Sequence, residues 1–201
     1  PFLPAHVPSS WDLAGHVRGY EPRWLNTLFA PALSIGMYVL LRIFTIARPR
    51  LKYKSDAESE RVNQHSALQF IDRIAAAMVL FFLVIQLTIT ALTLGWHVDV
   101  SFVINLSLSL LLIFIGNYMG KLPRNSWTGI KTPWTRASDT VWERTHRLGG
   151  WLFVATGVLG IIMGFIPFLG IWGIVGLLLL ITVWLYIYSY IIYHRLQTAG
   201  K

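Results

Sequence analysis

Five stretches of the sequence are each long and apolar enough to cross a lipid bilayer, which takes about 20 residues of helix. They cover approximately residues 24–47, 67–94, 102–118, 148–166 and 171–193. In lipid every backbone amide must be paired within its own segment, so these stretches are predicted to be α-helices. They also lack the alternation of apolar and polar residues that is typical of barrel strands. The sequence therefore predicts an all-α integral membrane protein, a polytopic bundle of five spans.

The composition agrees with this prediction. Hydrophobic residues make up 55% of the 201 residues and charged residues only 13%, whereas a soluble domain has about 25% charged residues. A soluble domain and a disordered chain are thereby excluded. The chain has no cysteine, which excludes a disulfide scaffold, thiolate catalysis, cysteine-ligated zinc and iron–sulfur clusters.

The net charge of +8 is unevenly distributed between the connections. Lys and Arg gather in the loops 48–66 and 119–147, while the connections 95–101 and 167–170 have none. By the positive-inside rule, both basic loops and the C-terminus are predicted to be cytoplasmic, and residues 1–23 external. The charge thus indicates topology, and we expect no nucleic-acid partner. Because nothing upstream of Pro1 would export that external segment, we also expect a further helix before it, giving six spans.

No catalytic signature is present. The sequence has no G-x-S-x-G, P-loop, H-E-x-x-H or Rossmann motif. No two acidic residues share a span, and no histidine lies at mid-span, where a ligand to a buried haem would be needed. We therefore expect no enzyme activity, no metal and no cofactor.

Several residues within the spans admit two interpretations. Asp72 and Arg73 lie near the cytoplasmic end of the second span, where they are either functional or reach the interface by snorkelling. Uncharged polar residues on the second and third spans are expected to form interhelical hydrogen bonds; they are Gln86, Thr88, Thr90, Asn105, Ser107 and Ser109. Small residues on the fourth span are expected to let helices pack closely; they are Gly157, Gly160 and Gly164.

The most informative segment is residues 116–150. Thr140 and Glu143 have capping-box spacing, which predicts a helix that begins near Thr140 and continues into the fourth span. Trp142 and His146 would then share one face of that helix. One interpretation is a cytoplasmic cap that docks Trp and His against the bundle, and the other is a binding site for a partner or ligand.

The residues of this segment carry a family resemblance. The run Gly116-Asn117-Tyr118-Met119-Gly120-Lys121 is followed by Asn125, by Gly129-Ile130-Lys131-Thr132-Pro133-Trp134-Thr135, by Val141-Trp142, and by Thr145-His146-Arg147 with Gly150. This pattern resembles the signature of SdpI-type immunity proteins. The N-terminal stretch LPAHVPSSWDLAGHVRGYEPRW is similar to the extracellular loop of the DUF1648 module that precedes the signature in longer members.

The resemblance implies a multi-pass protein of the bacterial plasma membrane that protects a cell from a toxic peptide and that in some members captures a cytoplasmic repressor. It divides the chain into an extracellular segment 1–23, a DUF1648-like helical pair 24–94, and an SdpI-like three-span region 95–201. The partner- or ligand-binding candidates that it implies are Asn117, Lys121, Asn125, Lys131, Thr132, Pro133, Trp134, Trp142, His146 and Arg147.

A second function stays open. A small bundle with packing glycines, many aromatic residues and no catalytic constellation is also typical of a structural or accessory subunit of a larger membrane complex. A transporter is less favoured because no charge lies at mid-span and no inverted repeat is evident.

Overall fold

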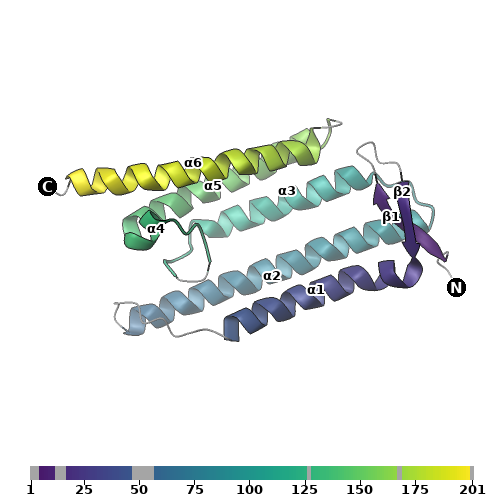
Figure 1. The fold of residues 1–201 in the computed structure, drawn as a ribbon, viewed down its shortest axis with the longest axis horizontal. Helices are drawn as coiled ribbons and strands as arrows, with labels where there is room; N and C mark the ends of the chain where they lie inside the picture. Colours follow the sequence, from purple (N-terminus) through teal and green to yellow (C-terminus); the bar gives the residue numbers. More distant parts are fainter. Residues whose placement is uncertain (1–4, 12–16, 47–56, 126–127, 167–168, 200–201) are drawn as a thin grey trace.

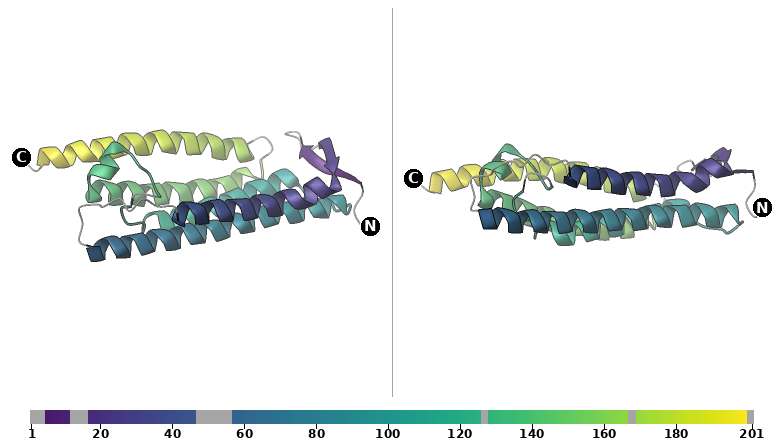
Figure 2. Two further views of the ribbon diagram at one scale, coloured as in Figure 1. Left: turned by 60° about the horizontal axis from the view of Figure 1, so that its bottom comes forward. Right: turned by 90° about the horizontal axis from the view of Figure 1, so that it is seen from below.

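The computed structural model describes residues 5–11, 17–46, 57–125, 128–166 and 169–199. Five long helices run along one common axis (Figures 1 and 2), with a strand pair at one end and a short helix, α4, at the other. We refer to these as the hairpin end and the loop end. The helical membrane fold predicted from the sequence is confirmed.

At the hairpin end, β1 (His6–Trp11) and β2 (Val17–Pro22) form an antiparallel pair with an irregular register between Pro8 and Trp11. The Val7 side chain is buried and Tyr20 is exposed. The sequence predicted an extracellular segment here but no strands. Prolines and glycines obscured the extended pattern, and only pairing between the two halves makes it a sheet.

The first two long helices, α1 (Arg23–Ile46) and α2 (Ala57–Thr93), pack side by side. The predicted loop 48–66 is therefore wrong in its second half, because α2 begins ten residues before the predicted span. Residues 57–66 are polar but contain no Gly or Pro, so helix propensity carries α2 beyond its apolar part.

The other three long helices are α3 (Val100–Met119), α5 (Asp139–Met163) and α6 (Gly170–Ala199). Helix α5 packs most extensively against α3 and also against α6 (Figure 1). The predicted start of α5 near Thr140 is confirmed, but the cap is Ser138, whose hydroxyl accepts a hydrogen bond from the Val141 amide. The Thr140–Glu143 capping box is wrong because both residues lie inside the helix.

Four of the described helices are long and apolar enough to cross a membrane: Leu68–Thr93, Val100–Met119, Asp139–Met163 and Gly170–Thr198. Helix α1 has 24 residues, a length of about 36 Å, against a hydrocarbon core of about 30 Å. This length is compatible with a fifth span, and the count of five stays a prediction.

The polar residues inside the helices do not behave alike. The buried Ser109 hydroxyl has no hydrogen-bond partner in the described part of the chain, so its predicted interhelical bond is wrong. Thr88 and Thr90 donate hydrogen bonds to carbonyl groups of their own helix, at 2.8 Å each, so for these hydroxyls the predicted interhelical bond is wrong. Asn105 is different, because its Nδ2 donates across to the Gly160 carbonyl of α5 at 2.7 Å. Threonine can satisfy itself within a helix, whereas the asparagine amide reaches a neighbour.

Candidate functional site

The site lies at the loop end, where the connection between α3 and α5 folds back on the bundle. It includes α4 (Pro133–Ala137), which packs against both α5 and α6. Trp127 lies outside the described residues. The candidate residues lie on this connection, including α4, and on the adjoining helices α3 and α5. A few buried polar groups determine the contacts that the connection makes.

Trp142 and His146 form the centre of the site. Both side chains are buried, with 2% and 0% of their surface exposed, and their rings stack with centroids 4.0 Å apart. The Trp142 indole donates a hydrogen bond of 2.9 Å to the Leu122 carbonyl. The first turns of α5 therefore hold the start of the connection in place.

Both ring nitrogens of His146 are engaged. The Ile130 amide donates to Nε2 at 2.8 Å, and Nδ1 lies 2.8 Å from the Trp142 carbonyl. A carbonyl can only accept, so Nδ1 carries the proton and the imidazole is neutral. His146 consequently has no free nitrogen for a metal or for proton transfer, and its place in this structure is that of a bridge between α5 and the connection.

Two glycines make room for this bridge. Gly129 has φ of +106°, and a Cβ atom on it would collide with the imidazole of His146. A Cβ on Gly149 would come within 2.9 Å of the Ile130 side chain. Gly129 of the signature therefore fits a backbone that passes directly over the Trp–His pair.

A threonine pair starts α4 and ties it to α6. Thr132 and Thr135 form a reciprocal capping box, and the Thr135 hydroxyl also donates to the Ile130 carbonyl at 2.8 Å. The Thr132 hydroxyl lies 3.0 Å from that of Ser189 on α6. Because the Ser189 hydroxyl donates to the Tyr186 carbonyl, Thr132 acts as the donor in this pair. Pro133 occupies the first turn, where a missing amide proton costs nothing.

Two further candidates have local roles. Trp134 packs edge-on against Tyr186 and Tyr190 of α6, with centroids 5.0 and 5.1 Å away. Asn125 donates to the Pro123 carbonyl and accepts from the Thr128 amide, both at 2.8 Å, and so organises a tight turn. These contacts fix the shape of the connection.

The remaining candidates face outward. Their side chains are exposed at the loop end, and they are Asn117, Lys121, Lys131, Pro133 and Arg147. Arg136 and Arg144 are exposed beside them. We call the exposed cations Lys121, Lys131, Arg136, Arg144 and Arg147 the outer cations. Partial burial, and then the charge of Arg136, lower the pKa of the Lys131 amine.

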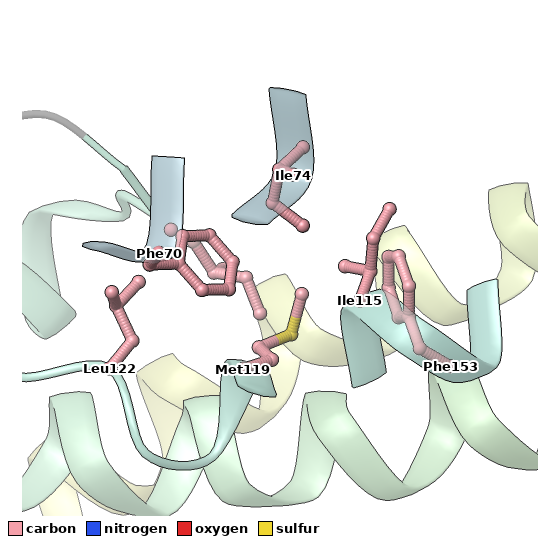
Figure 3. A pocket seen from close by; sticks show the side chains of 8 residues that line it. Phe70, Ile74, Ile115, Met119, Leu122 and Phe153 are labelled. Atoms are coloured by element: carbon pink, nitrogen blue, oxygen red, sulfur yellow. The ribbon is translucent and has the colours of Figure 1, made fainter. Parts of the chain in front are cut away.

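A cavity of about 330 Å³ lies beside the connection (Figure 3). Phe70 and Ile74 of α2 line it together with Leu122 of the connection. Ile130 of the connection also belongs to the lining. Its volume is in the range of small-molecule pockets, but its lining is apolar and offers no group for acid–base chemistry. It can accommodate only an apolar group.

The packing glycines lie where α5 meets α3. A Cβ atom on Gly157 would come 2.5 Å from the Ser109 carbonyl oxygen, and one on Gly160 would lie 2.5 Å from the Ser109 hydroxyl. Gly164 is the C-cap of α5 and faces the Asn105 amide. A further close approach, between Gly116 and Gly150, lies nearer the loop end.

The structure thus divides the candidates into two groups. It brings Thr132, Trp134, Trp142 and His146 together as contacts that hold the connection, with Asn125 shaping its turn. The other candidates are exposed at the surface, and they are Asn117, Lys121, Lys131, Pro133 and Arg147. Thr135 and Ser189 were missed. The spacing Thr132-Pro133-x-Thr135 is a readable capping signal, whereas Ser189, 57 residues from Thr132, gives none.

Comparison with known proteins adds to this geometry. Residues 121–191, which include the connection, α5 and most of α6, match the SdpI/YfhL protein family. This stretch of the chain is therefore similar to that family.

The similarity extends beyond the matched region. Immunity protein SdpI of Bacillus subtilis (strain 168) is 24% identical over 193 residues, covering 96% of this chain and 84% of the relative. No solved structure gives a significant match. The SdpI resemblance predicted from the sequence is confirmed, and the DUF1648 resemblance of the N-terminal part stays a prediction.

Proposed function

We propose that this protein is a multi-pass membrane immunity protein that protects a bacterial cell against a toxic peptide. The match of residues 121–191 to the SdpI/YfhL family carries this proposal, and a relative named as an immunity protein aligns over nearly the whole chain. Neither name denotes an enzyme, and the buried polar side chains of Thr132, Trp142 and His146 are occupied by structural hydrogen bonds.

The loop end faces the cytoplasm in this proposal, together with the C-terminus. The outer cations gather there, whereas the connection between α2 and α3 at the opposite end has no Lys or Arg. This asymmetry supports the orientation by the positive-inside rule. Alkaline phosphatase fused to the C-terminus should therefore be inactive in cells, and an active fusion would show that the orientation is the opposite one.

The outer cations form a docking surface for a cytoplasmic protein, such as a repressor captured at the membrane. Their backbone is held by Trp142 and His146, so the charges are presented on a fixed frame. Exposed charges act on association more than on folding. Replacing Lys121 and Arg147 together by Gln should weaken capture of the partner and leave the protein folded.

Protection is tested by expression in sensitive bacteria. Cells that express the chain should survive each toxic peptide whose gene neighbours this one, and cells with an empty vector should not. Killing that is unchanged for every such peptide, at a confirmed level of membrane-inserted protein, contradicts the proposal. Co-purification of a stoichiometric set of membrane subunits would instead favour an accessory subunit.

A further inference from the structure

A groove of about 450 Å³ runs between α2 and α3, separate from the cavity beside the connection. On α2 its lining residues follow helical spacing, and they are Arg73, Ala76, Ala77, Leu80, Phe81 and Val84. On α3 they are Ser107, Leu110, Leu111 and Phe114. The stretch from 73 to 84 corresponds to about 16 Å of helix, so the groove is elongated along α2.

The groove faces outward from the bundle. Leu80 and Leu110 on its walls are 60% and 52% exposed. Ala76 and Ala77 are small and deepen the groove in the turn that follows Arg73. In a bilayer this face meets lipid chains, and a groove of this shape fits one of them better than a flat helix surface does.

One charge lies at the end of this apolar lining. Among the described residues that line the groove, Arg73 is the single charged one, and its guanidinium lies 4.9 Å from the centroid of the Tyr118 ring. Tyr118 follows Phe114 by one turn on α3, so the ring continues the wall of the groove. An ionisable residue within a span is costly unless it has a partner. Arg73 lies at the end of the apolar groove that is nearer the loop end.

We infer that the α2–α3 groove binds a phospholipid with an anionic headgroup, with one acyl chain along the groove and the headgroup at Arg73. The apolar walls account for the chain and the guanidinium for the anion, because Arg pairs well with phosphate in a bidentate manner. A zwitterionic lipid would fill the same walls but gain less at Arg73. The site is independent of the proposed immunity function and of the outer cations.

Native mass spectrometry of the purified full chain tests this site, with phosphatidylglycerol and phosphatidylcholine of the same acyl chains as probes. We expect about fivefold more phosphatidylglycerol to be retained, as a single cation near the headgroups would give. Arg73→Gln should reduce this retention to that of phosphatidylcholine. Arg195→Gln, which removes an exposed charge from the end of α6, should leave it unchanged.

The apolar walls are tested separately. Ala76→Trp should fill the groove and lower the retention of both lipids, whereas Leu83→Trp, on an exposed face of α2 that does not line the groove, should lower neither. Circular dichroism checks that each variant is folded, and Arg73→Lys keeps the charge and should keep most of the preference.

Three results would overturn the inference. One is equal retention of the two lipids by the unmodified protein, and another is a preference that survives both Arg73→Gln and Ala76→Trp. The third is a dimer that Ala76→Trp dissociates, which would assign the groove to a second copy of the chain.

Discussion

The α3–α5–α6 half and the α1–α2 half of this protein are held together in different ways. Helices α3 and α5 approach so closely that glycine backbones touch, as at Gly116 and Gly150. In the α1–α2 half, Ile71, Ala75 and Thr88 are the only buried side chains among the described helical residues. Because lipid gives helices no hydrophobic drive to associate, close packing stabilises the first half, whereas α2 leaves a groove open where it meets α3.

The largest expected effect comes from separating α3 from α5. In Gly157→Leu the new side chain would meet the Ser109 carbonyl, so we expect a loss of at least about 3 kcal/mol in the free energy of unfolding. SDS titration of the purified protein measures it. Gly36→Leu on α1, where a Cβ atom would have no neighbour within 4 Å, should cost far less, and equal losses would remove the contrast between the halves.

Truncation of the central tryptophan should come next. Trp142→Ala leaves a buried cavity and an unpaired Leu122 carbonyl, and we expect it to cost about 3 kcal/mol by the same titration. Trp151→Ala on the same helix is the control, because Trp151 is 71% exposed. Trp142→Phe keeps a ring but loses the donor, and should cost about 1 kcal/mol. If Trp142→Ala costs little stability, the connection is held by other contacts.

Substitution of Gly129, which lies against the His146 imidazole, should have an intermediate effect on stability. Gly129→Ala forces an L-residue to φ of +106° and against His146, and we expect a loss of about 2 kcal/mol in stability. Gly95→Ala separates the two causes, since Gly95 has φ of +87° but no atom near its Cβ position. The Gly95 variant should cost about 1 kcal/mol. If the Gly129 and Gly95 variants lose the same stability, the contact with His146 does not restrict the residue at position 129.

The smallest effect is expected where α4 meets α6. A double-mutant cycle with Thr132→Val and Ser189→Ala should give a coupling energy of about 1 kcal/mol from their hydrogen bond. Ser138→Ala paired with Ser189→Ala is the control, because the two hydroxyls serve different helices. A coupling near zero for the first pair would show that this hydrogen bond does not anchor α4 to α6.

Much of this fold could be read from the sequence, because the bilayer imposes both helix length and helix type on an apolar stretch. The apolar parts of α2, α3, α5 and α6 were located in this way. What hydropathy could not reveal is polar helix beyond the apolar part, as at the start of α2. The β1–β2 pair was missed for a similar reason, since it depends on pairing between segments.

The sequence could predict which residues belong to the candidate site, but not which of them are buried and which are exposed. The signature singled out His146 and Lys121 alike, yet only the structure separates a buried imidazole with two hydrogen bonds from an exposed amine. Burial depends on where the connection folds back, and that is decided by contacts across the fold, such as Thr132 with Ser189.

The most direct test of the proposed function is survival of sensitive bacteria challenged with each toxic peptide whose gene is found to neighbour this one. Cells that express the protein should survive, as should cells with Lys121 and Arg147 both changed to Gln, because protection needs the folded bundle. Cells with Gly157→Leu should die. Death of all three strains, with the unmodified protein present in the membrane, would contradict an immunity function.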